Sequence, residues 1–349
     1  MHYVSLFSGI EAATVAWHPL GWEPVAFSEI EPFPSAVLAH HYPTVPNLGD
    51  MTKVDWSAYA GVDLVCGGSP CQAFSVAGLR RGLADPRGNL ALEYLRAVDA
   101  MRPRWVVWEN VPGVLSSGAG RDFGAILGAL GQLGYGWAYR VLDAQHVRTQ
   151  SHPRAVPQRR RRVWLVGCLG DWRCAAAVLL ERESMFWHRP PRREAGQGAA
   201  HTLTGGSGNR GWSSSVDGVG THFIPEVSNA LCSNDYKGSK ADKGLGAPLI
   251  PEVARGYAVR RLTPRECERL QGFPDDYTRI PWRTYQEAAR KGVSYESLLN
   301  ERGMRLREPT TEHCPDGPRY KALGNSWAVN EAAWIGQRIQ AFDLTRYAR

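Results

Sequence analysis

Two side chains in the first third of the chain combine the residue type and the placement of a nucleophile and its acid–base partner. Cys71 comes just after an apolar run at 63–66 and the pair Gly67-Gly68, so a short loop carries its thiol beyond an expected strand. Glu109 follows a second apolar run, 105–108. A thiolate can attack an electron-poor carbon, and a nearby carboxyl group can hold or donate a proton. Two purely structural interpretations remain open: Cys71 as a small buried side chain and Glu109 as a helix-capping carboxylate.

A third signal is the spacing between Gly9 and Glu29. Gly9 lies in the turn after the first expected strand, and Glu29 ends the second strand 20 residues later. This arrangement is typical of a nucleoside half-site, in which the acid holds ribose hydroxyls. Only one glycine stands where a dinucleotide fingerprint has three, so an adenosine ligand without a diphosphate, such as S-adenosylmethionine, fits better than NAD.

The elements that must position these groups alternate in type. Short apolar, β-branched runs predict strands at 3–7, 24–27, 63–66, 105–108, 137–142 and 163–167, and the segments 10–20, 33–41, 90–101 and 123–133 predict helices. Such alternation predicts a doubly wound α/β fold with a mostly parallel, Rossmann-like sheet. Because parallel strands end at one edge, we expect Cys71 and Glu109 to face one cleft.

Changes in composition and sequence pattern divide the chain into three parts. Residues 1–168 form the α/β domain. Residues 169–258, with a Gly- and Ser-rich stretch, predict a second, smaller domain of irregular or β structure. In residues 259–349, Thr263 and Pro264 predict a capped helix, 327–342 predicts a closing amphipathic helix, and 284–307 reads as a charged helical insertion.

Composition narrows the class of protein. The 349 residues carry a formal charge of +7, and residues 140–162 alone hold seven arginines against Asp143. This cluster indicates either a contact with a polyanion or a solvated basic loop, and the charge does not decide between them. No apolar run approaches the roughly 18 residues of a membrane helix, and no secretory signal is visible. The seven cysteines lack zinc-site spacing. We therefore expect a cytoplasmic monomer with no metal and no membrane contact.

Eight short motifs resemble, in order, those of the DNA (cytosine-5) methyltransferases. They are Phe7-Ser8-Gly9, Ser28-Glu29, Gly49-Asp50, Pro70-Cys71-Gln72, Glu109-Asn110-Val111, Gln158-Arg159-Arg160-Arg161-Arg162, Arg265-Glu266 and Gly324-Asn325-Ser326. The match spans residues 4–330 and is most similar to compact bacterial and bacteriophage modification enzymes. One departure is Glu11, which stands where a second glycine is usual.

The resemblance implies sequence-specific methylation of cytosine C5 in double-stranded DNA. Cys71 would add to C6 of a flipped-out cytosine, and Glu109 would hold or protonate N3. Arg162, and Arg160 through positioning, would anchor the O2 side of the ring. Residues 1–168 would then be the catalytic and cofactor-binding domain and 169–258 the target-recognition domain, with 259–349 returning to the first.

The same resemblance implies S-adenosyl-L-methionine as cofactor and S-adenosyl-L-homocysteine as product. The cofactor residues would be Phe7, Gly9, Ile10, Glu29, Ile30, Asp50, Met51, Pro70, Leu90, Asn325 and Ser326. The DNA contacts would be Gln72, Ser75, Arg80, Arg81, Arg87, Thr202 and Leu203. Two alternatives stay open: an RNA cytosine-5 methyltransferase, and a catalytically idle DNA-binding protein. No obligatory protein partner is evident.

Overall fold

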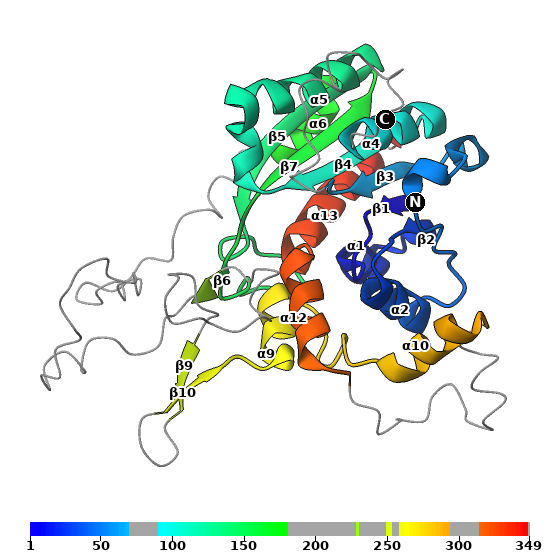
Figure 1. The fold of residues 1–349 in the computed structure, drawn as a ribbon. Helices are drawn as coiled ribbons and strands as arrows, with labels where there is room; N and C mark the ends of the chain where they lie inside the picture. The colour runs from blue at the N-terminus through cyan, green and yellow to red at the C-terminus, as the bar shows by residue number, and fades with distance from the viewer. Residues whose placement is uncertain (70–89, 181–227, 230–248, 253–257, 294–313, 348–349) are drawn as a thin grey trace, which may run out of the picture.

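The computed structural model describes residues 1–69, 90–180, 228–229, 249–252, 258–293 and 314–347. Its centre is a six-stranded sheet with the order β2-β1-β3-β4-β7-β5 (Figure 1). The strands are β1 (His2–Leu6), β2 (Glu23–Ser28), β3 (Leu64–Gly67), β4 (Trp105–Asn110), β5 (Tyr135–Asp143) and β7 (Arg161–Leu169). Each lies within a few residues of a strand expected from the sequence.

The sheet is mixed but mostly parallel. β1 pairs in parallel with β2 and β3, and β3 pairs in parallel with β4. β7 is antiparallel to both of its neighbours, β4 and β5, so the other five strands all run in one direction. The predicted fold class, an α/β fold with a mostly parallel, Rossmann-like sheet, is confirmed.

Helices cover both faces of this sheet (Figure 1). Side chains alternate along each strand, so Trp105 and Val107 of β4 enter one apolar cluster while Val106 and Trp108 enter the other. The first cluster includes residues of α1 (Ala12–Trp17), α6 (Trp172–Leu179) and α13 (Val329–Tyr347). The second includes residues of α4 (Leu90–Met101) and α5 (Arg121–Gln132).

The C-terminal helix α13 packs against the N-terminal helix α1. Trp17 Nε1 donates a hydrogen bond to the Ala332 carbonyl oxygen at 2.8 Å. A Cβ atom at Gly336 would lie 2.5 Å from the Trp17 ring, so only glycine allows this close approach. The C-terminal helix therefore packs against the helix that follows the first motif.

Three elements depart from the expected boundaries. α6 begins beyond residue 168, the expected domain limit, yet it packs on β5 and on α13. α1 begins at Ala12 and continues as a 3₁₀ turn, η1 (His18–Leu20), whereas a helix was expected from residue 10. α10 (Trp282–Lys291) opens the expected 284–307 insertion two residues early, and 294–307 lie outside the described residues.

The remaining described elements are short. They are α2 (Pro32–His41), α9 (Pro264–Gln271), α12 (Asp316–Asn325), the 3₁₀ turns η2 (Met51–Lys53), η3 (Trp56–Tyr59), η5 (Pro112–Leu115) and η6 (Ser117–Gly120), and the strand pairs β6 (Gln158–Arg159) with β8 (Ser228–Asn229) and β9 (Leu249–Glu252) with β10 (Ala258–Arg261). The predicted cap of α9 is confirmed, because Thr263 and Glu266 form a reciprocal capping box. Most of 169–258 lies outside the described residues.

Candidate active site

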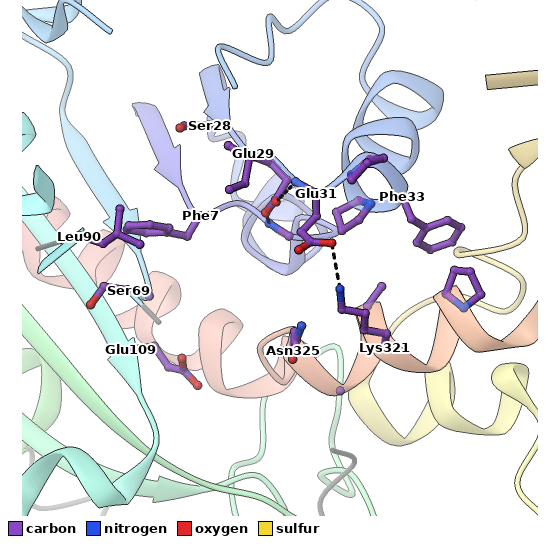
Figure 2. Close-up of a pocket in the computed structure, with 18 of the residues that line it drawn as sticks. Phe7, Ser28, Glu29, Glu31, Phe33, Ser69, Leu90, Glu109, Lys321 and Asn325 are labelled. Atoms are coloured by element: carbon purple, nitrogen blue, oxygen red, sulfur yellow. Dashed lines mark hydrogen bonds and ion pairs between the residues drawn. The ribbon is translucent and has the colours of Figure 1, made fainter. Parts of the chain in front are cut away.

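A cavity of about 800 Å³ opens at the carboxyl edge of the parallel strands. The turn after β1 contributes Phe7 and Gly9, the end of β2 contributes Ser28 and Glu29, and β3 leads to Gly68 and Ser69. Glu109 lies near the end of β4, and α12 contributes its last residue, Asn325 (Figure 2). This is the edge at which open α/β sheets bind their ligands.

Glu29 is held by backbone donors on two sides. Its Oε2 accepts a hydrogen bond from Gly9 N at 2.8 Å, and its Oε1 accepts one from Glu31 N at 2.7 Å. Burial raises the pKa of Glu29, and these N–H donors oppose the rise. A carboxylate has about four acceptor sites, so Glu29 keeps capacity for hydroxyl groups of a ligand.

Glu11 occupies the position in the first motif at which a second glycine is usual. Its φ of 63° is left-handed, a conformation that normally favours glycine. Its buried carboxyl accepts hydrogen bonds from Ser5 Oγ at 2.8 Å and from Thr14 N at 3.1 Å, and so caps α1. Burial raises the pKa of Glu11 to about 7. Glutamate thus adopts the left-handed conformation here, and Glu11 is not among the described residues that line the cavity.

Asp50 and Met51 form the wall beside β2. Asp50 caps η2 by accepting from Thr52 N at 3.1 Å and from Thr52 Oγ1 at 2.8 Å, and these bonds lower its pKa. Ser28 Oγ donates to the Gly49 carbonyl oxygen at 2.7 Å, which ties this turn to the end of β2.

Glu109 and Arg162 form an ion pair on the cavity wall. Arg162 Nε lies 2.9 Å from Glu109 Oε1, and the Glu109 residue is 8% exposed. Burial raises the pKa of Glu109, whereas Arg162 and Arg160 lower it. The pair therefore presents a carboxyl group whose protonation depends on its arginine partner and on any ligand that enters.

The residue after Glu109 holds the last described residue after β3. Asn110 Nδ2 donates to the Ser69 carbonyl oxygen at 2.8 Å, and Trp108 Nε1 donates to Ser69 Oγ at 3.3 Å. β4 thus fixes both its own terminal carboxyl group and the last described residues after β3.

Arg160 contacts the backbone at the end of α12. It is 1% exposed, and its guanidinium donates to the carbonyl oxygens of Gly324, at 3.2 Å, and of Ser326. These carbonyls lie where α12 ends, so Arg160 links the arginine motif to the closing motif of the chain.

The structure brings together many of the residues expected from the sequence. The expected cofactor residues on the cavity wall are Phe7, Gly9, Glu29, Ile30, Asp50, Met51, Leu90 and Asn325, and Glu109, Arg160 and Arg162 join them there. Ile10 and Ser326 are placed differently. Ile10 is fully buried in the apolar core, and Ser326 is buried with its carbonyl turned to Arg160. Pro70, Cys71, Gln72, Ser75, Arg80, Arg81, Arg87, Thr202 and Leu203 lie outside the described residues.

Other wall residues were not expected. Lys321 Nζ lies 2.9 Å from Glu31 Oε2, so α12 is joined to the start of α2 across the cavity (Figure 2). Trp282 of α10 also lines the wall and packs edge-on against Phe33. Lys321 stands one helical turn before Asn325, a spacing that could have indicated it. Trp282 carries no such signal.

The described residues lack two further features. They contain no group of three or more His, Cys, Asp or Glu side chains arranged to hold a metal ion. Within the same ranges, no helix has the length and apolar character needed to cross a membrane.

Comparison with known proteins relates the chain to DNA methyltransferases. A family model described as C-5 cytosine-specific DNA methylase matches residues 1–184 and 211–294. A protein of Escherichia phage P1 named DNA N-6-adenine-methyltransferase is 32% identical over 97% of this chain, which spans 61% of that protein's length. The type II methyltransferase M2.BsuMI of Bacillus subtilis is 28% identical over 97% of this chain and 75% of its own.

A solved structure shares the fold. The crystal structure of S. pombe Dnmt2 methyltransferase superposes with a TM-score of 0.59, at 16% identity, and covers 98% of this chain and 99% of its own. At this level of identity the likeness concerns the fold alone.

Proposed function

The chain belongs to the C-5 cytosine-specific DNA methylase family, and we propose that it methylates C5 of a specific cytosine in double-stranded DNA, with S-adenosylmethionine as the methyl donor. The observation that carries the proposal is the Glu109–Arg162 pair, which lines the same cavity as Glu29. A base-binding acid and a ribose-binding acid would then share one space, as methyl transfer between their two ligands requires.

Cytosine C5 is too weak a nucleophile to take a methyl group unaided. In the proposed reaction, Cys71 Sγ bonds to C6 while N3 receives a proton from Glu109, and the C5=C6 electron pair becomes available at C5. After C5 is methylated, a water molecule removes the C5 proton, N3 returns its proton to Glu109, and Cys71 leaves C6 as a thiolate. The bond made to sulfur is broken again, so the nucleophile is regenerated.

The neighbours of Glu109 suit this role. Arg162 lowers the pKa that burial raises, so the acid can both hold and release a proton near N3. Arg162 also extends a guanidinium beside the O2 edge of a base held at Glu109. Ser69, two residues before Cys71 in the sequence, is fixed by Asn110 and Trp108.

The cavity wall also suits the proposed cofactor. Glu29 has free acceptor capacity for ribose hydroxyls, and Asp50 presents a carboxylate for an adenine amino group. Ile30 lines the cavity with 69% of its surface exposed, which an adenine ring would cover. S-adenosylmethionine supplies a methyl group made electrophilic by its attachment to a positively charged sulfur.

The DNA substrate must give up a base, since C6 is inaccessible within the stacked duplex. Flipping a base costs a few kcal/mol, which contacts elsewhere must offset. We propose the basic stretch 140–162 and the side chains of Gln72, Ser75, Arg80, Arg81, Arg87, Thr202 and Leu203 for those contacts. Residues 169–258 carry ten basic and nine acidic residues, a balance that suits base reading.

The name of the phage P1 relative raises adenine N6 as a competing target. This chain spans 61% of that protein, so the named activity can reside in the unmatched part. An exocyclic amine needs no covalent activation by a thiol at a ring carbon. The Pro70-Cys71-Gln72 motif and the Glu109–Arg162 pair therefore favour cytosine C5.

The test is to express the chain in a methylation-deficient host and analyse the host DNA as nucleosides by mass spectrometry. We expect 5-methylcytosine, absent with Cys71→Ala, and bisulfite sequencing should place it in one short recurrent sequence. N6-methyladenine alone, methyl groups in RNA alone, or no methylated base at all would each overturn the proposal.

A further inference from the structure

A buried acid lies behind the Glu109–Arg162 pair. Glu331, in the first turn of α13, has no exposed surface. Its Oε2 accepts a hydrogen bond from Trp164 Nε1 at 2.8 Å. Its Oε1 is buried and has no hydrogen-bond partner among the described residues. Burying a charged carboxylate with so few hydrogen bonds costs free energy, and a proton on the free oxygen removes the charge and therefore that cost.

Two indole rings connect this acid to Glu109. The ring of Trp164 packs edge-on against Trp327, with centroids 4.9 Å apart. The Trp327 side chain in turn acts as a hydrogen-bond donor that lowers the pKa of Glu109. Gly68 borders both partners, since a Cβ atom there would lie 3.2 Å from Glu109 Oε2 and 3.4 Å from Trp327 Nε1. Glu331, Trp164, Trp327 and Glu109 thus form one continuous contact chain.

The nearby arginines are committed to other partners. Arg162 Nε pairs with Glu109, and the guanidinium of Arg160 donates to the carbonyls of Gly324 and Ser326. Among the described residues, Glu331 forms no ion pair within 4.0 Å. Burial therefore dominates and raises the pKa of Glu331 to about 8, with Glu109 adding to the rise and Arg162 and Arg160 opposing it.

The other elements packed on α13 add few charges. Helix α1, with the sequence AATVAW, carries no titratable side chain. η1 carries His18, and α6 carries Cys174 together with Arg173, which pairs with Asp171. The groups that act electrostatically on Glu331 are therefore Glu109, Arg160 and Arg162, the proposed catalytic groups themselves.

We propose that Glu331 is a positioning residue for Glu109: as an uncharged acid it fixes Trp164 and, through Trp327, the Glu109 carboxyl group, and it leaves Arg162 to pair with Glu109 alone. This inference rests on the proposed function. Ionised, Glu331 would compete for Arg162 and repel the Glu109 carboxylate, so Glu109 would lose its orientation toward N3.

The chain offers a matched control on the same helix. Asp343 is also buried, also accepts a hydrogen bond from an indole, Trp105 Nε1 at 3.2 Å, and lies three helical turns from Glu331. Unlike Glu331 it has an ion-pair partner, Arg104, at 2.6 Å. Asp343→Asn therefore changes a comparable carboxyl group far from Glu109.

The experiment measures kcat and KM for DNA from pH 6 to pH 9 in the wild type, Glu331→Gln and Asp343→Asn. Glutamine mimics the protonated acid, so we expect wild-type kcat near pH 7 and a kcat ratio of variant to wild type that rises about tenfold by pH 9. Titration of groups that do not interact with Glu331 cancels in this ratio. KM for DNA should stay within twofold, and Asp343→Asn should keep a constant ratio. A flat ratio for Glu331→Gln in an active enzyme overturns the inference.

An infrared difference spectrum separates this inference from the proposed function. Wild type minus Glu331→Gln, without DNA or cofactor at pH 7, should show the C=O band of a protonated carboxylic acid. Wild type minus Asp343→Asn should show carboxylate bands instead. If no variant or wild type transfers methyl groups at any pH, the proposed function fails while this band still reports on Glu331. A carboxylate band for Glu331 overturns the inference whatever the activity.

Discussion

Arg162 Nε lies 2.9 Å from Glu109 Oε1, although the two residues are far apart in sequence. The strand register explains the contact. Glu109 of β4 is paired directly with Trp164 of β7, and Arg162 is two residues before Trp164 on the same face of the sheet. Diagonal neighbours of this kind are within reach of long side chains. The antiparallel direction of β7 thus builds the pair that carries the proposed function.

Replacing Glu109 by glutamine should remove most of the activity. The amide fills the same space, but it cannot deliver a proton to N3, so we expect kcat to fall by about 10²- to 10⁴-fold. Cofactor affinity, measured by calorimetry, should change by less than threefold, because Glu29 and Asp50 are untouched. A kcat within tenfold of wild type would remove Glu109 from the chemistry.

Gly68, which borders Glu109, should also be sensitive to substitution. A Cβ atom at Gly68 would lie 2.9 Å from the Glu109 carbonyl oxygen, a backbone atom that cannot move freely. We expect Gly68→Ala to displace Glu109 and to reduce kcat by about tenfold or more.

Gly124 provides the matched control for this substitution. It lies in α5, and a Cβ atom there meets nothing within 4 Å. Gly124→Ala should leave kcat unchanged and raise the free energy of unfolding by about 0.5–1 kcal/mol. Equal kcat values for the two alanine variants would contradict the role given to the turn after β3.

Glu29 should control cofactor affinity and its pH dependence. Glu29→Ala removes the acceptor for ribose hydroxyls and frees Gly9 N, so we expect the Kd for S-adenosylmethionine to rise by about tenfold or more, with DNA affinity unchanged. Because burial raises the pKa of Glu29, its ionised form is lost on acidification sooner than that of an ordinary glutamate. Wild-type affinity should therefore weaken toward pH 5, whereas that of Glu29→Gln should be flat. An unchanged Kd in both variants would exclude Glu29 from the cofactor site.

Because of the buried Glu331, the free energy of unfolding should fall as the pH rises. Its pKa is about 8 in the folded protein against an ordinary value of 4.5, so between these values the folded state binds one proton more than the unfolded state. Stability then falls with pH by at most about 1.4 kcal/mol per pH unit, starting near pH 4.5 and ending near pH 8. Glu331→Gln lacks this dependence. Urea unfolding should show its advantage over wild type growing from pH 5 to pH 8, and a constant difference would contradict a neutral buried acid.

Much of the fold could be predicted because strands and helices leave different periodic patterns. The alternation of runs such as 63–66 and 105–108 with amphipathic segments indicated the sheet and its helices. The reversed direction of β7 left no such pattern, since it depends on which strand is the neighbour. The start of α1 was misplaced because Glu11 caps it from a left-handed conformation, which glutamate rarely adopts.

In the candidate site, too, some residues could be predicted from the sequence and others could not. Glu29 follows β2 directly and Glu109 is the second-last residue of β4, so sequence alone could assign them to the sheet edge. Ile10 was expected in the pocket, but its side chain is fully buried in the apolar core that includes residues of α1 and α13. Glu331 and Trp327 could not be found, because their roles arise only when α13 packs against β7.

The most direct test of the central claim, covalent activation of cytosine by Cys71, is mechanism-based trapping. A duplex with 5-fluorocytosine at the target position blocks the final proton loss, so the enzyme should stay bonded to C6. With S-adenosylmethionine present, we expect a protein–DNA adduct that survives denaturation and maps to Cys71 by peptide mass spectrometry. Cys71→Ala should bind the duplex but form no adduct. A wild-type enzyme that methylates unmodified DNA yet never forms this adduct would contradict the account.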